Sequence, residues 1–204
     1  RYSVNTNINR FVSGDEKSSQ LSLIGRVNNV NDRRFGGGGW GNNRGLNTAK
    51  EIGLNYALET KKVDLGASVR YNYRKNDVFS FGQVENFLPS GNSSFANSNS
   101  SNRNKNKNLI GDFRMEWNPN EMTTFLLKGN MTWGESNGLS SSKSSTFDKD
   151  HYVEMPNLTD LTNYLGKNEG LPEELKNILV NASDNRSSTD GKSLSANAEM
   201  QLTR

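Results

Sequence analysis

The chain has 204 residues, enough for one or two globular domains, but only 31% of them are hydrophobic and the mean hydropathy is −0.84. This composition leaves three classes of protein open: a disordered linker, a β-fibre, or a β-barrel with polar loops and lumen. The three Trp, six Tyr and nine Phe count against the linker, because disordered chains usually lack aromatic residues. The 25 basic and 22 acidic residues are interspersed along the chain, so the sequence shows no cluster of positive charge typical of nucleic-acid binding. Since the chain has no Cys, disulfides and thiolate metal sites are excluded.

Apolar and polar residues alternate with a period of two through most of the chain, which predicts β-strands. No apolar run reaches 18 residues, so no transmembrane helix is expected, and no signal peptide is recognisable. Both ends interrupt an alternating pattern, and we therefore interpret the chain as an internal fragment. The expected strands and connections of the first half are, in order, a strand at 1–12, a turn at 13–18, a strand at 21–28, a glycine-rich tip at 35–41, a strand at 51–58, a turn at 60–62 and a strand at 63–74.

In the second half the same rhythm continues and is then interrupted. Extended structure is expected through Phe87, followed by a turn at 89–92, a strand ending at 109–117, a turn at 118–121 and a strand at 124–133. Residues 134–191 break the alternation and predict one long loop with two short helices, near 159–165 and 172–180. The last strand is expected at 194–203. Three short turns thus alternate with longer connections, a design typical of outer-membrane barrels, which have short periplasmic turns and long extracellular loops.

On this interpretation the two faces of the strands meet different surroundings. Val, Leu, Phe and Met would face lipid, and charged residues on the opposite face would line a wet lumen: Arg70, Arg74, Asp112, Arg114, Glu116, Lys128 and Glu199. The expected lipid-facing and girdle aromatics are Tyr56, Tyr71, Tyr73, Phe113, Trp117 and Trp133. The alternative for these rings is the core of a soluble sheet.

Arg103, Lys105 and Lys107 are odd-numbered, as are Leu109 and Phe113 on the same expected strand, so they are expected on the same lipid-facing side. They are candidates for contact with lipopolysaccharide phosphates, through charge-assisted bonds. A solvated strand edge is an equal alternative for the three residues.

Other motifs give no catalytic or cofactor site. The pattern Gly36-x-Gly38-x-x-Gly41 lacks the βαβ context of a dinucleotide fingerprint and predicts a flexible loop tip. His151 and Glu154 are too few for a metal site, and a surface pair is the preferred interpretation. No nucleophile, base and acid occur in a recognisable frame, so we expect no enzyme, no cofactor and no metal.

Several segments share a recognisable pattern: Gln20–Asp32, the glycine tip, Gly45–Lys50, Ser68–Tyr73, Glu85–Leu88, Ser94–Ser98 and Asp112–Pro119. Together they resemble the outer-membrane β-barrels of Bacteroidetes, which are similar to TonB-dependent receptors, and the resemblance covers most of residues 1–140 and the final strand. It implies a larger barrel in the cell outer membrane, a plug domain and a TonB complex as partner, none of which this chain contains.

The sequence therefore predicts an all-β chain, an antiparallel up-and-down meander of about seven strands that forms part of one transmembrane β-barrel domain spanning 1–204. Its expected partners are outer-membrane lipid and lipopolysaccharide, an unidentified ligand or nutrient, and no nucleic acid. The alternative function is a soluble or cell-surface β-rich adhesin or glycan-binding module.

Overall fold

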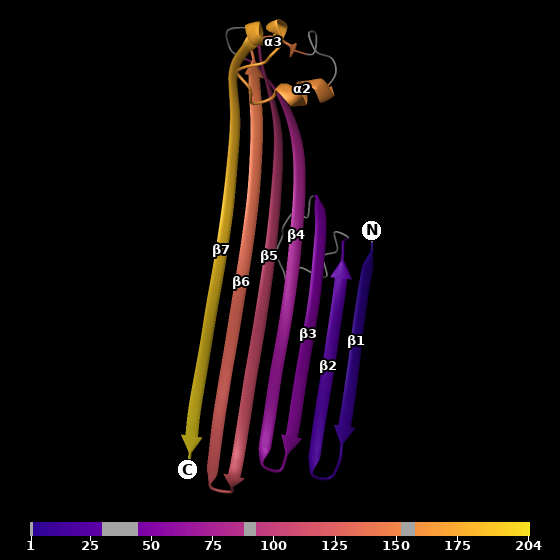
Figure 1. Cartoon of the computed structure of the whole chain (residues 1–204), viewed down its shortest axis with the longest axis vertical. Coiled ribbons are helices and arrows are strands. Elements are labelled where there is room, and N and C mark those ends of the chain that lie inside the picture. Colours follow the sequence, from indigo (N-terminus) through magenta and orange to yellow (C-terminus); the bar gives the residue numbers. More distant parts are fainter. Residues whose placement is uncertain (1, 30–44, 88–92, 152–157) are drawn as a thin grey trace. The chain divides into compact units, whose positions relative to one another are not determined.

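The chain folds into one antiparallel seven-stranded sheet in a computed structural model that describes residues 2–29, 45–87, 93–151 and 158–204. The strands lie side by side in sequence order (Figure 1). They are β1 (Ser3–Ser13), β2 (Lys17–Asn28), β3 (Leu46–Thr60), β4 (Val63–Phe87), β5 (Ser93–Asn120), β6 (Thr123–Phe147) and β7 (Leu179–Thr203). The predicted all-β, up-and-down meander is confirmed. The sheet is not closed, because β1 and β7 are its two edges.

Two short helices, α2 (Leu158–Tyr164) and α3 (Glu173–Ile178), lie between β6 and β7. Neither they nor any other helix in the described ranges has the length and apolar character needed to cross a lipid bilayer. Pro172 is the N-cap residue of α3, and Glu173 and Glu174 occupy its first turn, where the helix dipole favours negative charge. The helices were expected at 159–165 and 172–180, so the second one is shorter than predicted.

Three tight hairpins join β1 to β2, β3 to β4 and β5 to β6. In the first, the backbone of Gly14 and Lys17 exchanges hydrogen bonds of 2.9 and 3.4 Å. In the second, the Thr60 hydroxyl accepts from the Val63 amide at 2.9 Å. These hairpins lie at the predicted turns 13–18, 60–62 and 118–121, although β1 extends to Ser13 and β5 to Asn120.

The chain divides into two compact units. Unit 1 comprises Arg1–Asn76, Asn104–Asn137 and Asp190–Arg204, and unit 2 comprises Asp77–Arg103 and Gly138–Thr189. All three hairpins belong to unit 1, while α2 and α3 belong to unit 2.

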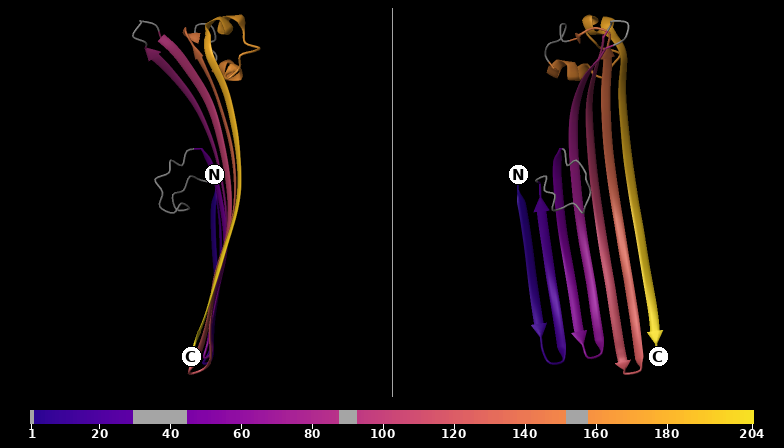
Figure 2. Two further views of the ribbon diagram at one scale, coloured as in Figure 1. Left: turned by 90° about the vertical axis from the view of Figure 1, so that its left-hand side faces the viewer. Right: turned by 180° about the vertical axis from the view of Figure 1, so that it is seen from behind.

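In unit 1 the strands form a single layer, seen edge-on in Figure 2. The register of β1, β2 and β3 places Ile8, Leu23 and Leu54 side by side. From β3 to β7 the register follows from contacts between opposed side chains: Lys50 over the Tyr73 ring at 5.9 Å, Ser68–Asp112 at 3.2 Å, Lys107–Glu135 at 3.1 Å and Asn130–Asn197 at 3.1 Å. Apart from Phe11, Ile24, Ile110 and Leu126, the large apolar residues of the strands in unit 1 therefore share one face, the apolar face, and the polar face lies opposite.

Unit 1 has no core of its own among its described residues, since the large apolar side chains that are buried in the described ranges all belong to unit 2. On the apolar face Met200 is 71% exposed, Leu194 69% and Val69 49%. A contiguous apolar surface of this kind marks contact with a membrane or with another protein layer.

Unit 2 holds a small hydrophobic core. Its buried members are Phe147, Leu161, Leu165, Leu175 and Ile178. Phe95, Tyr164, Leu171 and Leu179 pack around them. The Asp148 amide donates to the Ile178 carbonyl at 2.9 Å, which closes the base of the connection that carries both helices.

The predicted loop at 134–191 is wrong in its extent, because β6 continues to Phe147 and β7 already starts at Leu179. Residues 134–147 contain seven serines or threonines and only two large apolar residues, Leu139 and Phe147, so the period-two signal is lost. The strands pair there through polar groups, such as Asn137 donating to Asp190 at 2.7 Å. The predicted glycine tip at 35–41 and the turn at 89–92 lie outside the described residues.

Candidate functional site

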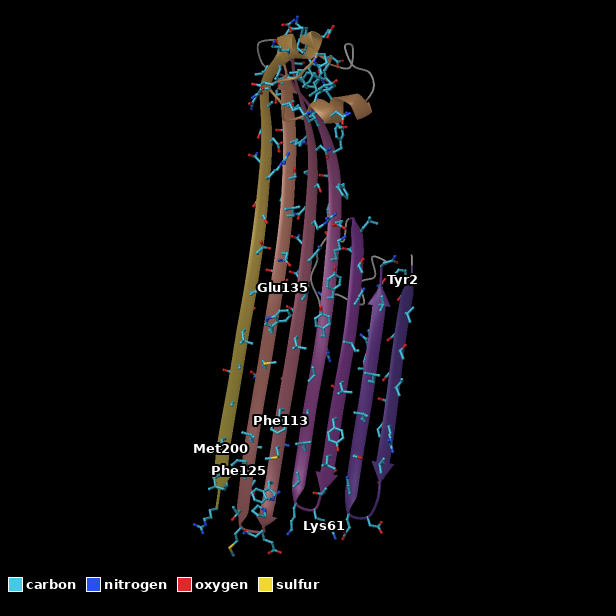
Figure 3. All side chains as sticks on the ribbon, in the orientation of Figure 1. Tyr2, Lys61, Phe113, Phe125, Glu135 and Met200 are labelled. Carbon is cyan, nitrogen blue, oxygen red and sulfur yellow. The ribbon has the colours of Figure 1, made fainter. Side chains whose placement is uncertain are left out.

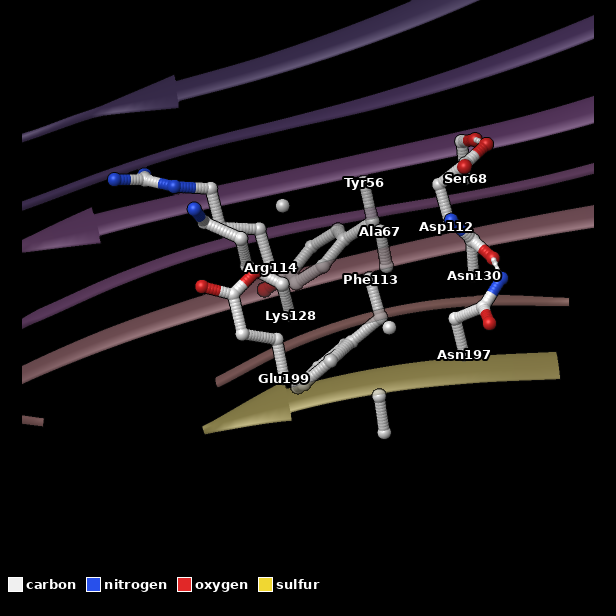
Figure 4. Close-up of a pocket in the computed structure, with 13 residues that line it drawn as sticks. Tyr56, Ala67, Ser68, Asp112, Phe113, Arg114, Lys128, Asn130, Asn197 and Glu199 are labelled. Carbon is white, nitrogen blue, oxygen red and sulfur yellow. Dashed lines mark hydrogen bonds between the residues drawn. The ribbon is translucent and has the colours of Figure 1, made fainter. Parts of the chain in front are cut away.

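The polar face of unit 1 carries a trough of about 580 Å³ across β4 to β7. Two rows of residues border it. The first row is Gly66, Arg114, Lys128 and Glu199, and the second row is Ser68, Asp112, Asn130 and Asn197. Figure 4 shows Arg114, Lys128 and Glu199 on one side of the trough and the second row on the other. Because side chains alternate along a strand, the backbone of the intervening Ala67, Phe113, Gly129 and Ala198 forms the floor.

Hydrogen bonds across the strands order the second row. The Ser68 hydroxyl donates to Asp112 at 3.2 Å, and the Asn197 amide donates to Asn130 at 3.1 Å. These amides and the hydroxyl keep further donor and acceptor capacity toward the open side. The second row is therefore suited to hydrogen bonding with a polar ligand.

The first row carries the charges. Arg114 contacts the carboxylates of Asp64 at 3.2 Å and Glu116 at 2.7 Å, so its charge is already balanced within the chain. Lys128 and Glu199 lie opposite each other, and among the described residues neither takes part in an ion pair. With cations and anions intermixed, the trough favours a polar ligand of mixed character over a purely anionic one.

Four of the seven residues predicted to line the lumen border this trough: Asp112, Arg114, Lys128 and Glu199. Arg70, Arg74 and Glu116 share the polar face by their register but do not line it. Arg70, which is half-exposed, lies 3.7 Å from the largely buried carboxylate of Glu51. The pattern of alternation had indicated the face of each residue, but only the register shows which of them are neighbours.

The apolar face of unit 1 is organised in rows that cross β3 to β7, which we call the apolar band. From the hairpin end the rows are Val63–Trp117–Phe125–Leu202, Leu58–Leu65–Met115–Leu127–Met200, Tyr56–Ala67–Phe113–Gly129–Ala198, Leu54–Val69–Gly111–Met131–Ala196 and Ile52–Tyr71–Leu109–Trp133–Leu194. Figure 3 shows Phe113, Phe125 and Met200 nearer the hairpin end than Glu135. Glu135 lies just beyond the band, in the row that follows Ile52–Tyr71–Leu109–Trp133–Leu194. Each row thus consists almost entirely of apolar side chains.

The six predicted aromatics all share the apolar face but differ in their position along it. Trp117 is in the row nearest the hairpins, while Tyr71, Tyr73 and Trp133 are at the other boundary of the band. Tyr56 and Phe113 lie in the middle row. The two boundaries are where interfacial rings are expected, and the middle row is not.

Two of the three predicted lipopolysaccharide contacts already have acidic partners. In unit 2, Arg103 Nε lies 2.6 Å from Asp77, whose side chain is only 11% exposed. In unit 1, Lys107 Nζ lies 3.1 Å from Glu135. Lys105, in unit 1, keeps the expected face and is half-buried.

His151 is buried, so the predicted surface pair with Glu154 is wrong for the histidine, and Glu154 lies outside the described residues. The His151 ring packs on Phe147 with centroids 5.0 Å apart, and the Asn97 amide donates to its Nε2 at 3.1 Å. Burial lowers the pKa of His151 below its ordinary value, although the Asp150 carboxylate opposes the shift. Within the described ranges no three His, Asp or Glu residues gather as a metal site.

Sequence reasoning did not single out Ser68, Asn130 or Asn197, because neutral polar residues are common on every strand of this chain. It also passed over Lys192, which lies between the predicted loop at 134–191 and the predicted last strand at 194–203. Comparison of the chain with protein-family models, with curated proteins and with solved structures finds no match to any of them.

Proposed function

We propose that the chain is a section of the wall of an outer-membrane β-barrel, similar to a TonB-dependent receptor, that binds or takes up a polar nutrient. The observation that carries this proposal is the two-sided character of unit 1. Five consecutive apolar rows cover one face, although nothing within the described residues of that unit buries them. The opposite face bears the polar trough.

The height of the apolar band is of the order expected for strands that cross a bilayer. Val63 and Tyr71, in the first and last of its five rows, are eight positions apart on β4, which is about 26 Å at about 3.3 Å per residue. With the tilt of about 40° usual for outer-membrane strands, the band would be about 20 Å tall, compared with about 25 Å for the apolar belt in such barrels.

The uptake function and the partners rest on the resemblance of the sequence segments to TonB-dependent receptors. A plug domain and contact with a TonB complex would be supplied by other parts of the protein. The mixed charge of the trough supports a polar cargo, since Lys128 and Glu199 offer opposite charges beside the amides of Asn130 and Asn197.

Cysteine labelling in the full-length protein tests the proposal, and this section contributes no Cys of its own. Met131→Cys and Asn130→Cys are neighbours on β6 with opposite faces. In outer membranes, a fluorophore at Met131→Cys should be quenched by brominated lipid, and Asn130→Cys should react with a water-soluble maleimide. Absence of quenching at Met131→Cys, in a protein that fractionates as soluble, would instead favour the adhesin or glycan-binding module.

A further inference from the structure

On the apolar face of unit 1, the band ends abruptly in charged residues. The row that follows Ile52–Tyr71–Leu109–Trp133–Leu194 is Lys50, Tyr73, Lys107, Glu135 and Lys192, and the next one includes Lys75, Lys105, Asn137 and Asp190. We call the five lysines of these two rows the lysine belt. They come from β3, β4, β5 and β7, so no single stretch of sequence reveals them together.

Contacts between side chains of neighbouring strands fix this placement. Lys50 Nζ lies over the Tyr73 ring at 5.9 Å, and Lys107 Nζ contacts Glu135 at 3.1 Å. The hydrogen bond from Asn137 to Asp190 aligns β6 with β7, so that Lys192 stands opposite Glu135. Lys50 and Lys192 are exposed, and the stems of Lys105 and Lys107 are half-buried.

The belt has an excess of positive charge. Among the described residues of these two rows, five are lysines and two are carboxylates, Glu135 and Asp190, and the latter accepts from Asn137. Lys50, Lys107 and Lys192 occupy alternate strands, which sets them about 10 Å apart along the belt. Lysine stems of this length can lie along apolar surface while the ammonium groups reach a polar layer.

We propose that the lysine belt binds the phosphate groups of an anionic glycolipid of the outer leaflet, of the lipopolysaccharide class. This inference rests on the proposed function, because the glycolipid headgroups meet the belt only if the apolar band lies in the membrane. Phosphate oxygens then accept charge-assisted hydrogen bonds from the lysine ammonium groups, with the acyl chains lying against the apolar rows. Arg103 is outside the belt, because it already pairs with Asp77 in unit 2.

Two variants with the same loss of charge test the proposal in the detergent-solubilised full-length protein. The first is Lys50→Gln, Lys105→Gln and Lys192→Gln, which leaves the Lys107–Glu135 pair intact. The control is Lys17→Gln, Lys61→Gln and Lys62→Gln, at the hairpin end of unit 1. Native mass spectrometry then measures the binding of added lipid A with its phosphates and of dephosphorylated lipid A.

We expect the belt variant to bind phosphorylated lipid A about tenfold or more weakly than the unmodified protein, while the control changes little. Dephosphorylated lipid A should bind all three proteins equally weakly. Unchanged binding by the belt variant, or equal binding of both lipids by the unmodified protein, would overturn the inference. If brominated lipid quenches at Met131→Cys but the belt variant binds normally, only this inference fails; if quenching is also absent, the proposed function fails with it.

Discussion

Gly166 ends α2 in a left-handed conformation, with a φ of +74°. A Cβ at this position would lie 2.7 Å from the Ser183 carbonyl oxygen and 3.2 Å from the Lys143 Cβ. Gly170 has a similar φ of +70°, but a Cβ there would meet nothing within 4 Å. The two glycines therefore separate the cost of backbone conformation from the cost of crowding.

Gly166→Ala should destabilise the helical connection more than Gly170→Ala does. Both substitutions carry the left-handed penalty of roughly 1–2 kcal/mol. Only the first also forces two strands apart from α2, which adds roughly 1–3 kcal/mol. Hydrogen exchange of amides 158–178 measures the free energy of local opening in each variant. Equal losses in the two variants would show that a Cβ at position 166 is not crowded by Ser183 and Lys143.

The buried His151 makes the same connection sensitive to pH. Its Nε2 accepts from the Asn97 amide, so protonation would place two donors against each other in a site that already disfavours charge. Because the pKa of His151 is lowered by folding, the unfolded chain binds more protons, and stability falls as the pH drops below about 6.5, the value in the unfolded chain. We expect full protection at neutral pH and above.

Hydrogen exchange of amides 158–178 at pH 7.5 and 5.5 checks this expectation. Asn97→Asp is the informative variant, because a carboxylate can accept from a protonated ring and should weaken the loss at low pH. A connection that opens equally at both pH values in the unmodified protein would show that His151 does not control it.

At the level of elements, alternation in the sequence predicts the strands only where one face is apolar. β4 is recognisable from Leu65, Val69 and Tyr73, which alternate with Asp64 and Arg70. Side-chain faces in unit 1 follow directly from this alternation, and so does the division into lumen-facing and lipid-facing candidates.

Where both faces are polar, sequence patterns fail for a physical reason. The ends of β6 and β7 carry Ser, Thr, Asn and Asp on both faces, and backbone pairing holds them without a hydrophobic signature. The trough was also beyond sequence reasoning, since it depends on the register that aligns Ser68 with Asp112 and Asn130 with Asn197. Burial of His151 was missed because its hydrogen-bond partner, Asn97, is 54 residues away in the sequence, on β5.

A matched pair of substitutions on β4 tests the apolar band as an element. Val69 lies in the fourth of the five rows from the hairpins, and its sequence neighbour Ser68 lies on the polar face. Lysine near the middle of a bilayer costs a barrel about 2–4 kcal/mol, but much less in a wet lumen. Val69→Lys should therefore lower the free energy of unfolding in lipid by about this amount, and Ser68→Lys by well under half of it.

The dependence on depth separates a bilayer from a protein interior. Val63, in the row nearest the hairpins, should tolerate lysine better than Val69, because the cost falls to about 0–1 kcal/mol near the interface. Urea titrations of the full-length protein in lipid vesicles give the three free energies. Equal costs at Val63 and Val69 would favour a dry interface with a second protein layer.

At the scale of the whole chain, stability has two separate sources. Unit 2 buries its own core around Leu161 and Leu175, whereas the described part of unit 1 buries no large apolar side chain. The strands of unit 1 are paired with one another, but β1 and β7 each have a neighbour on one side only. Their other edges present unpaired amide and carbonyl groups, which neither hydrocarbon nor water-free protein tolerates.

These open edges predict that the 204-residue chain, produced alone, does not form a monomeric fold that is stable in detergent. We expect association through β1 and β7, seen as oligomers by light scattering after gel filtration. Amides of β1 and β7 should exchange quickly compared with those of β3, β4 and β5, which have partners on both sides. In the full-length protein, by contrast, neighbouring strands would pair with both edges and protect these same amides. A detergent-stable monomer of the isolated chain with slow exchange in β1 and β7 would mean that the sheet satisfies its own edges, and the proposal of a barrel wall would then be wrong.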